Sequence, residues 1–480
     1  MWNSGTLTRN EARLIGYPTT QSSNVNNYWS LLGYLFDPYT FDDVSGDTSL
    51  NNFNINKAPS YVFSVINDIQ SINPYLRVHL LPWSPPGWMK DSGSINGGNF
   101  LNQYINTYAS YLLKSLQGFQ SHGITAYANE PENSNPTYPT CIVTATQEAQ
   151  IATALRTLMN NNGFSGVKII GYDHNWNDAG GYPIQIMQQA QDAFAGVAFH
   201  CYSGTVDQQN TFHNAYPNKE IYFTECTGEY GSDWWSDIKW YMDNLYIGAV
   251  TYNAQAVLMW NLALDGNGQP ELPGSNSCGN PPCRPIVTIS GSSYTFNQEF
   301  YSMAQASRAI IPKDPNGPWG KRIGVTVGGS LSWALVVGAY VTGRVSSSDW
   351  LRYSLVVLNW DDSASTTWNP VSVTTTIEFR GMQATYTFPV GVTTLWWFAP
   401  ATSTEHARSL GSTNFTAPAS VVDVNGTSFT PTAVDVTSDS HPEAPHYTAS
   451  VSWSSPRATA TAQSDETPVL KMRGSGWFNQ

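Results

Sequence analysis

Apolar and polar positions change their pattern twice along the chain. From about residue 58 to 300, short apolar runs alternate with longer stretches of helical periodicity, which indicates parallel strands joined by helical crossovers. The expected strands are 76–81, 124–128, 168–171, 196–200, 221–224 and 254–260, and the expected helices include 102–119, 146–160, 184–195 and 234–248.

Polar, aromatic and acidic residues gather directly after each of these strands. In a (β/α)₈ barrel the loops after the strands form the reactive face, so this arrangement favours an α/β fold of the TIM-barrel type. A doubly wound sheet would also alternate strands with helices. The chain has no Gly-rich phosphate loop after a first strand, and such a loop is typical of that alternative.

The second change of pattern begins near residue 319. Short β-branched runs such as WGKRIGVTV, SWALVVGAYVT and TTLWWFA continue to 399, separated by turn residues and without helical periodicity. They predict an antiparallel β-sandwich. From 401 onward Ser, Thr, Ala and Pro dominate, which is typical of a disordered tail. We therefore expect an unmatched segment 1–36, a barrel domain 37–305, a sandwich domain 306–400 and a tail 401–480.

Composition narrows the classes of function. Only 12% of the 480 residues are charged, 13% are aromatic, and the formal net charge is −13. Nucleic-acid binding is disfavoured because phosphate contacts need clustered Lys and Arg, and no run of about 20 apolar residues predicts a membrane span. Aromatic rings suit the apolar faces of sugars. A large aromatic core would explain the same composition equally well.

Cysteine usage leans towards an extracellular protein. Cys278 and Cys283 bracket a Gly-Asn-Pro-Pro loop that suits a small disulfide hairpin, and Asn414 and Asn425 begin two N-x-T sequons. The first residues lack the basic–apolar–small pattern of a signal peptide. No Cys/His spacing predicts a zinc site, and we expect neither a metal nor a cofactor.

The segment TAYANEPENS, residues 125–134, is the first candidate for chemistry. An apolar strand runs into Asn129-Glu130-Pro131, and Pro131 ends strand pairing. Glu130 then lies at the carboxyl end of a barrel strand, and Asn129 can bind a sugar hydroxyl beside it. An isolated Asn-Glu-Pro is otherwise more often a simple turn.

A second acidic residue follows another strand. In KEIYFTECTG, residues 219–228, Glu225 comes directly after the apolar residues 221–223. Two carboxyl groups facing each other are what glycoside hydrolysis needs, and in retaining enzymes they lie roughly 5–5.5 Å apart. The alternative is that Glu225 forms a structural ion pair with Lys or Arg.

A rigid aromatic loop follows the strand at 76–81. In LLPWSPPGWMK, two prolines and a glycine fix a loop that carries Trp83 and Trp88. Indoles held in this way suit a sugar subsite. Packing against neighbouring helices is an equally good interpretation for Trp88 and a weaker one for Trp83.

Together with YTFDD, GYDHNW, AFHCYSG and LMWNLALD, these segments resemble family 30 glycoside hydrolases between about residues 37 and 400. The fungal endo-β-1,6-glucanases are the most similar branch, and the glucosylceramidases are related. The resemblance implies a (β/α)₈ barrel with a β-sandwich, a retaining mechanism, Glu130 as acid/base and Glu225 as nucleophile.

The same resemblance implies further pocket residues. Trp260 matches the tryptophan that floors the sugar site, Trp83, His174 and Tyr202 match residues lining it, and Tyr202 is placed to hydrogen-bond the nucleophile. His174 and His200 are as readily explained as hydrogen-bonded core or rim histidines. The expected substrate is a β-1,6-glucan, with glucosylceramide or β-1,6-galactan as alternatives.

Residues 1–36 do not match the family. The first two βα units of the barrel, and the arginine that follows the second strand, have no counterpart in the segment before YTFDD. A barrel without those units exposes two strand edges, so we expect a poorly stable and weakly active chain.

Two functional classes remain after this comparison. The first is an extracellular, monomeric hydrolase that acts on a polysaccharide or glycolipid. The second is an inactive carbohydrate-binding protein, in which the aromatic platform persists without turnover. A purely structural wall protein rests on the Ser/Thr-rich tail alone and has little support.

Overall fold

The computed structural model describes residues 39–129, 139–270, 281–314, 317–343, 350–362 and 369–399, together with five backbone strands beyond residue 400; for 127–129 it describes the backbone alone. The chain divides into two compact units. One contains the described residues up to Ile238 and Gly248–Tyr301, and the other contains Lys239–Ile247 and the chain from Ser302 onward.

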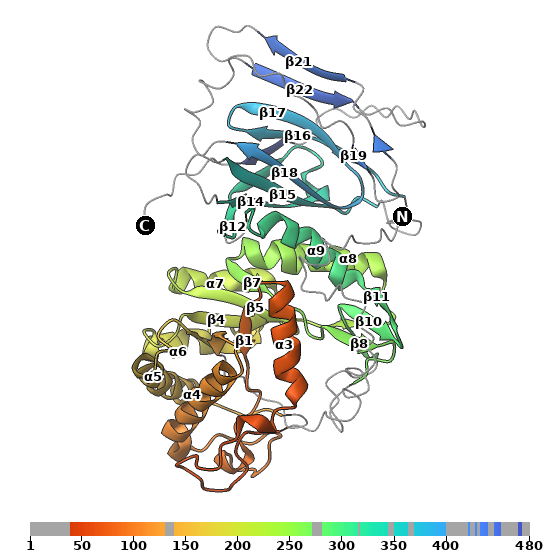
Figure 1. Cartoon of the computed structure of the whole chain (residues 1–480). Coiled ribbons are helices and arrows are strands. Elements are labelled where there is room, and N and C mark those ends of the chain that lie inside the picture. Colours follow the sequence, from red (N-terminus) through yellow and green to blue (C-terminus); the bar gives the residue numbers. More distant parts are fainter. Residues whose placement is uncertain are drawn as a thin grey trace. The chain divides into compact units, whose positions relative to one another are not determined.

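A parallel sheet with the strand order β1-β2-β3-β4-β5-β7 is the centre of the first unit (Figure 1). Each of the six strands predicted from the apolar runs is present. Strands β3 and β5 extend beyond their predicted ends into polar residues. The strands are β1 (Val78–Leu80), β2 (Ala126–Asn129), β3 (Lys168–Asn175), β4 (Gly196–His200), β5 (Glu220–Glu225) and β7 (Ala254–Val257).

Helices connect successive strands, as the alternating pattern predicts. Helix α4 contacts β2, and α5 and α6 contact β3. Helix α3 packs Phe63 beside Val78 of β1 and Phe119 of α4. The helices of this unit are α3 (Ser60–Ile72), α4 (Ile105–Ser121), α5 (Ala145–Asn161), α6 (Tyr182–Ala190) and α7 (Gln209–Ala215). Helix α8 (Trp234–Tyr241) begins in this unit, whereas its last residues and most of the π-helical segment η6 (Met242–Ala249) belong to the other.

Local sequence explains where α5 begins. The Thr144 hydroxyl accepts a hydrogen bond from the Gln147 backbone N–H at 3.3 Å, and the Gln147 side chain accepts one from the Thr144 N–H at 2.8 Å. This reciprocal capping box satisfies N–H groups that a helix start leaves without partners. The predicted helix 146–160 is therefore confirmed within one residue at each end.

Buried apolar side chains fill both faces of the parallel sheet. Every residue of β4 is buried, as expected for a strand covered by helices on one side and by the barrel interior on the other. Ile170, Ala198 and Tyr222, from β3, β4 and β5, form one inner cluster. Burial of each large apolar side chain contributes roughly 1.5–3 kcal/mol.

The six-stranded order begins with β1 and ends with β7 in the described part of the chain. The expected loss of two βα units concerns residues before Tyr39, which lie outside the described ranges, so that expectation stays a prediction. Three smaller strands, β8 (Ala263–Asp265), β10 (Val287–Ser290) and β11 (Ser293–Phe296), form a separate sheet in the order β11-β10-β8.

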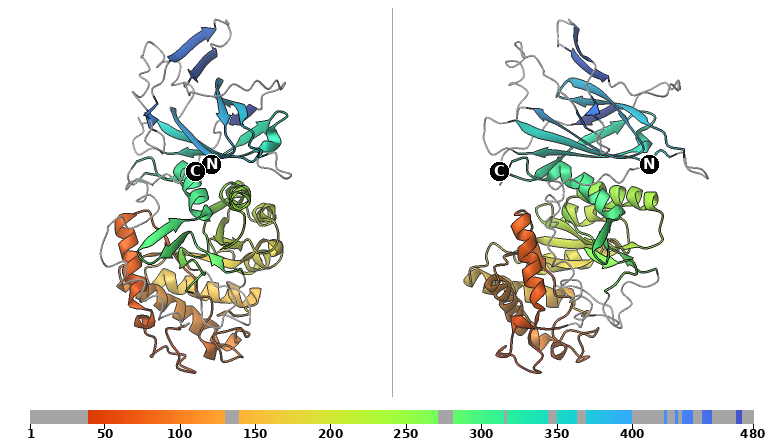
Figure 2. Two further views of the ribbon diagram at one scale, coloured as in Figure 1. Left: turned by 90° about the vertical axis from the view of Figure 1, so that its right-hand side faces the viewer. Right: turned by 45° about the vertical axis from the view of Figure 1, so that its right-hand side comes forward.

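Antiparallel sheets dominate the second unit, seen from other sides in Figure 2. One has the order β12-β14-β15-β18, and the other includes β13, β16 and β17. Both sheets contribute to a shared apolar core, so the predicted sandwich is confirmed. The bounds are β12 (Gly320–Ile323), β13 (Val325–Gly328), β14 (Leu335–Thr342), β15 (Leu351–Asn359), β16 (Val373–Phe379), β17 (Met382–Phe388) and β18 (Gly391–Ala399), and helix α9 (Gln298–Ile310) precedes them.

Alternating burial along β16 shows how the sandwich is built. Val373, Thr375, Ile377 and Phe379 are buried, whereas the residues between them are more exposed. A period of two places one side of a strand against the opposite sheet. Strand β15 is buried along its whole length, consistent with cover on both faces.

Five strands lie in the segment 401–480, for which we expect a disordered tail. Strand β23 pairs with both β13 and β16, and β22 pairs with β17. The sequons at Asn414 and Asn425 are outside the described residues. These strands are β19 (Val421–Val422), β20 (Ser428–Phe429), β21 (Ala433–Asp439), β22 (His446–Ser452) and β23 (Val469–Met472).

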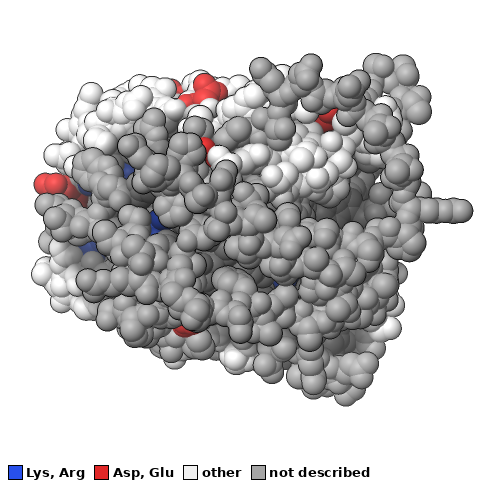
Figure 3. Space-filling model, turned by 90° about the horizontal axis from the view of Figure 1, so that it is seen from above, with Lys and Arg blue, Asp and Glu red and all other residues white. Residues whose placement is uncertain are grey.

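The face shown in Figure 3 has few charged side chains among its described residues. Most described atoms visible in Figure 3 belong to residues that are neither acidic nor basic, in keeping with the charged fraction of 12%. Across the described ranges, no helix combines the length and apolar character that a bilayer crossing demands.

Candidate active site

Glu225 is the last residue of β5, at the carboxyl end of the parallel sheet. Its predecessors Ile221, Tyr222 and Phe223 are buried, while Glu225 is only partly buried. The apolar residues therefore fix the strand, and the carboxylate emerges where the strand ends. This is the face on which barrel enzymes place their reacting groups.

The phenol of Tyr202 holds the Glu225 carboxylate. Its Oη donates a hydrogen bond to Glu225 Oε1 at 3.0 Å, and the backbone N–H of Tyr202 is held in turn by Asn175 Oδ1 at 3.0 Å. Burial raises the pKa of Glu225 above its ordinary value, while nearby His200 and the Tyr202 hydrogen bond act to lower it. The contact expected for Tyr202 is present.

Asp173 and His200 form a buried pair beside Glu225. His200 Nε2 lies 2.9 Å from Asp173 Oδ1, and their side chains are 2% and 0% exposed. His200 is therefore the hydrogen-bonded core histidine that we considered as one interpretation. Sequence analysis did not select Asp173, although it lies in the GYDHNW segment.

His174 lies next to this pair at the end of β3. Its ring centre is 6.2 Å from that of His200. Burial, reinforced by His200, lowers the pKa of His174 below its usual value. His174 lies near the carboxyl end of β3, and Glu225 ends β5 at the same edge of the sheet. The place of His174 in the pocket lining stays a prediction.

Two tryptophans form an aromatic corner. The rings of Trp83 and Trp260 are 5.2 Å apart and inclined at 82°, and the Trp260 backbone N–H donates to the carbonyl of Cys226, next to Glu225, at 2.8 Å. The structure thus brings together two indoles that the sequence placed in different loops, Trp260 being tied to the residue that follows Glu225.

Trp88 has a structural environment instead. Its Nε1 donates to the carbonyl of Asp42 at 2.9 Å, and its ring packs edge-on against Tyr104. Of the two interpretations for Trp88, these contacts favour packing.

Lys90 anchors the loop that carries Trp83. The buried amine donates to Ser84 Oγ at 2.7 Å, to the carbonyl of Ile95 at 2.6 Å and to that of Thr140 at 2.9 Å. Burial lowers the pKa of Lys90 to about 8. A buried amine with three oxygen partners satisfies its donors and holds the loop. In the sequence, the one sign of a role for Lys90 is that it closes the segment containing Trp83 and Trp88.

Glu130, the other expected catalytic residue, lies outside the described residues. The backbone of Asn129 ends β2 and pairs with Leu80 of β1 and Ile169 of β3. Strand β2, which Glu130 follows in the sequence, is thus next to β3 and three strands from β5 in the sheet order. The separation of the two carboxylates stays a prediction.

A disulfide joins the loops after β4 and β5. Cys201 and Cys226 are bonded, and they directly follow His200 and Glu225. Sequence analysis did not predict this pair, although each cysteine comes just after a predicted neighbouring strand, which is a usable signal. Cys283 is also disulfide-bonded, whereas its expected partner Cys278 lies outside the described residues.

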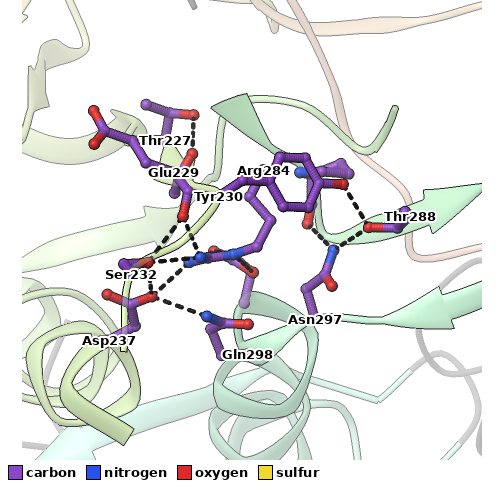
Figure 4. Close-up of polar contacts among 12 residues, drawn as sticks. Thr227, Glu229, Tyr230, Ser232, Asp237, Arg284, Thr288, Asn297 and Gln298 are labelled. Atoms are coloured by element: carbon purple, nitrogen blue, oxygen red, sulfur yellow. Dashed lines mark hydrogen bonds and ion pairs between the residues drawn. The ribbon is translucent and has the colours of Figure 1, made fainter. Parts of the chain in front are cut away.

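The chain that follows Glu225 is anchored by Arg284 (Figure 4). Its guanidinium lies 2.6 Å from Glu299 Oε1 and 2.7 Å from Asp237 Oδ2, and also donates to the carbonyl of Glu229. Arg284 and Glu299 are buried. The Glu299 contact fastens β9 (Cys283–Arg284) to the start of α9 (Gln298–Ile310), and the contact with the Glu229 carbonyl joins β9 to β6 (Gly228–Glu229), with which it pairs in an antiparallel ladder.

We also looked for side chains that could bind a metal ion in the described residues. Within the described ranges, no group of three or more His, Cys, Asp or Glu side chains is arranged to hold a metal ion.

Comparison with known families decides the relationship. The model of the glycosyl hydrolase family 30 TIM-barrel domain matches residues 33–310, more than half of the chain. The chain belongs to glycosyl hydrolase family 30. The predicted family and the α/β barrel class are thereby confirmed.

Relatives within family 30 carry glucanase names. An endo-1,6-beta-D-glucanase of Neurospora crassa is 33% identical over 315 residues, covering 62% of this chain and 61% of its own. One of Trichoderma harzianum is 34% identical over 294 residues, covering 57% and 58%. The structure of the endo-beta1,6-glucanase BT3312 aligns with a TM-score of 0.64 and 25% identity, covering 75% of this chain and 79% of that one. The chain thus spans about three-fifths of the two curated relatives.

Proposed function

We propose that this family 30 chain is a retaining glycoside hydrolase that cleaves a β-linked glucan, with Glu225 as the nucleophile and Glu130 as the acid/base. The observation that carries the proposal is the Glu225 carboxylate at the end of β5, held by Tyr202 at 3.0 Å. A hydrogen-bonded carboxylate at a barrel's reactive face is suited to attack an anomeric carbon and form a glycosyl ester.

The reaction has two stages. Glu130 protonates the leaving oxygen while Glu225 attacks, and a water activated by Glu130 then releases the sugar with its configuration retained. Two carboxyl groups suffice for this chemistry, so the proposal includes no metal or cofactor. The Trp83–Trp260 corner stacks against sugar rings, and Asn129 and His174 bind hydroxyls beside the scissile bond.

Glu225→Gln and Glu130→Ala test the assignment on a β-1,6-glucan such as pustulan. We expect Glu225→Gln to lose at least about 10³-fold in kcat, since a neutral amide neither attacks nor leaves as a carboxylate. Glu130→Ala is assayed separately on an aryl β-1,6-gluco-oligosaccharide, because its phenolate leaves without protonation. Azide should then attack the glycosyl ester, restore turnover and give a β-glycosyl azide.

Glu220→Gln is the matched control, because Glu220 lies on the same strand at its opposite end and pairs with Lys168 at 2.6 Å. Full activity of Glu225→Gln, or an equal loss in Glu220→Gln, would refute the assignment.

Substrate choice within this class is the finer part of the proposal. The relatives named endo-1,6-beta-D-glucanases support β-1,6-glucan as the substrate, ahead of a glucosyl lipid or β-1,6-galactan. Product analysis on pustulan, galactan and glucosylceramide separates the three. Faster release of glucose from the lipid than from pustulan would reverse the order.

The same surface supports a second candidate, a carbohydrate-binding protein without turnover. The aromatic corner needs no catalytic pair to hold a sugar. Pustulan binding without product, unaffected by Glu225→Gln, is the result that favours this candidate.

We also propose that the chain works outside the cell as a monomer. The Cys201–Cys226 bond supports an oxidising compartment. Detection of this disulfide in protein collected from the culture medium tests the location. A mass of one chain by light scattering tests the monomeric state.

A further inference from the structure

Strands β3 and β5 each insert one extra residue into their pairing with β4, the strand between them. Gly171 and His174 of β3 pair with Val197 and Phe199 of β4, so three steps on β3 match two on β4. On the other side, Phe223 and Glu225 of β5 pair with the consecutive residues Phe199 and His200. The extra residue of β5 is therefore Thr224. Such bulges occur beside active sites, where they redirect a side chain.

The bulge in β3 has a costly backbone. Tyr172 has φ of 75° and Asp173 has φ of 46°, values in the left-handed region that residues other than glycine seldom adopt. Strain of this kind persists only where the surroundings impose it, and it clusters at functional sites.

One carboxylate oxygen joins the two bulges. Asp173 Oδ1 accepts a hydrogen bond from Thr224 Oγ1 at 2.6 Å and lies 2.9 Å from His200 Nε2. Asp173 is fully buried, and its Oδ2 has no hydrogen-bond partner in the part of the chain that the structure describes. A buried carboxylate is expensive in free energy, so its retention here calls for a function.

The consequence falls on Glu225. Tyr222 points into the inner cluster with Ile170 and Ala198, whereas Phe223 packs against Trp176. Strict alternation would direct Glu225 to the same side as Phe223, because side chains two apart share a face. The extra residue Thr224 interrupts the alternation, and Glu225 reaches Tyr202 instead.

We propose that Asp173 is a positioning residue for Glu225: by joining Thr224 of β5 to His200 of β4, it holds the bulge that turns the Glu225 carboxylate toward the substrate. This inference rests on the proposed function of Glu225 as nucleophile. It assigns Asp173 a geometric role, through hydrogen bonds, and no contact with the sugar.

Glu148 of α5 supports the bulge from behind. Its Oε1 accepts a hydrogen bond from the backbone N–H of Tyr172 at 3.0 Å. Gly171 leaves room for this contact, because a Cβ there would lie 2.6 Å from the same oxygen. The strained residues are thus held on both sides, by Glu148 and by the Asp173 contacts.

Four variants of the whole chain test the role of Asp173: Asp173→Ala, Asp173→Asn, Thr224→Val and the double variant Asp173→Ala/Thr224→Val. Asparagine keeps an acceptor oxygen where Asp173 Oδ1 lies, whereas alanine removes it. We expect Asp173→Ala to lower kcat on pustulan about 100-fold, since small displacements of a reacting group have effects of this order. KM should change less than about threefold, because sugar contacts remain.

The conservative variant distinguishes geometry from charge. Asp173→Asn should keep kcat within about threefold of the wild type, Thr224→Val should lose about tenfold, and the double variant should be no slower than Asp173→Ala, as expected for residues that act together. Glu220→Gln, on the same strand, serves as the unaffected control. Melting curves of each variant confirm that the protein assayed is folded.

Three outcomes would overturn the proposal. If Asp173→Ala keeps the wild-type kcat, Asp173 has no positioning role. If Asp173→Asn loses as much kcat as Asp173→Ala, the charge of Asp173 matters and not its geometry, and if the losses of kcat add up in the double variant, Asp173 and Thr224 act independently. If Asp173→Ala does not fold, Thr224→Val and Asp173→Asn still decide. Glu225→Gln is measured in parallel. If the proposed function of Glu225 is wrong, this variant remains active, which separates that failure from a failure of the Asp173 proposal.

Discussion

The Tyr202 hydroxyl donates a hydrogen bond to Glu225 Oε1 at 3.0 Å, across the ends of two adjacent parallel strands. The bond favours the ionised carboxylate and so opposes burial, which raises the pKa of Glu225. A nucleophile must be ionised to attack. Nearby His200 also lowers this pKa and Asp173 raises it, and the balance of these influences sets the lowest pH at which the proposed reaction proceeds.

Tyr202→Phe should move the acidic limb of the pH–rate profile to higher pH. Loss of the hydrogen bond raises the pKa of Glu225 further, so activity disappears at a higher pH as the solution is acidified. We expect kcat at the optimum to fall about tenfold. The measurement is kcat/KM on pustulan from pH 3 to 8, and an unmoved acidic limb would contradict it. Tyr216→Phe, at the residue that caps the carboxyl end of α7, is the control.

Glu148 should make the fold less stable as pH rises. Burial raises the pKa of its carboxyl from 4.5 to about 7. Because the folded pKa is the higher one, the stabilisation is fully present below about 4.5 and is lost as pH rises through about 7.

Glu148→Gln stays neutral at every pH and so escapes this loss. Its melting temperature relative to the wild type should therefore increase between pH 5 and pH 8. Thermal denaturation at several pH values provides the test, and a constant difference would show that Glu148 does not titrate in this range.

The Cys201–Cys226 bond should contribute both to stability and to activity. It closes a sequence separation of 25 residues, for which restriction of the unfolded chain contributes about 3 kcal/mol. Cys201→Ser/Cys226→Ser should lower the free energy of unfolding by that amount in urea titrations. It should also reduce kcat, because the cysteines adjoin His200 and Glu225. Unchanged kcat in the folded double variant would limit the bond to a stabilising role.

Arg284→Met should be strongly destabilising. The substitution leaves the Glu299 carboxylate, 1% exposed, without its guanidinium partner, and isolating a buried charge costs about 3–5 kcal/mol. Lys57→Met is the matched control, since its partner Asp43 is 66% exposed and such pairs contribute roughly 0.2–1 kcal/mol. Chemical denaturation of both variants tests the contrast, which comparable losses would refute.

The regular elements of the barrel unit followed from local pattern. Strand β4 has the predicted bounds Gly196–His200 because its apolar run ends sharply. Strand β3 continues to Asn175 through polar residues that resemble a loop. Helix α3 was missed, because Ser60–Ile72 has no side-chain cap at its start and several β-branched residues.

The site was only partly visible in the sequence. Glu225 could be placed because it follows a predicted strand, whereas Tyr202 and Trp260 were implied by the family resemblance. The contact of Asp173 with Thr224 joins residues 51 apart in the chain, and it depends on two bulges that hydrophobic periodicity does not reveal. Arg284 and Glu299 were likewise missed, since neither follows a strand of the parallel sheet.

If sugar rings stack on Trp83 and Trp260, as we propose, the right angle between the two indoles restricts the shape of the glycan. With ring planes at 82°, one flat pyranose can stack on only one indole at a time. Two successive sugar units that touch both rings must therefore be rotated by about a quarter turn relative to each other. A stiff, ribbon-like polymer resists that rotation, whereas a chain with an extra rotatable bond between its units accepts it readily.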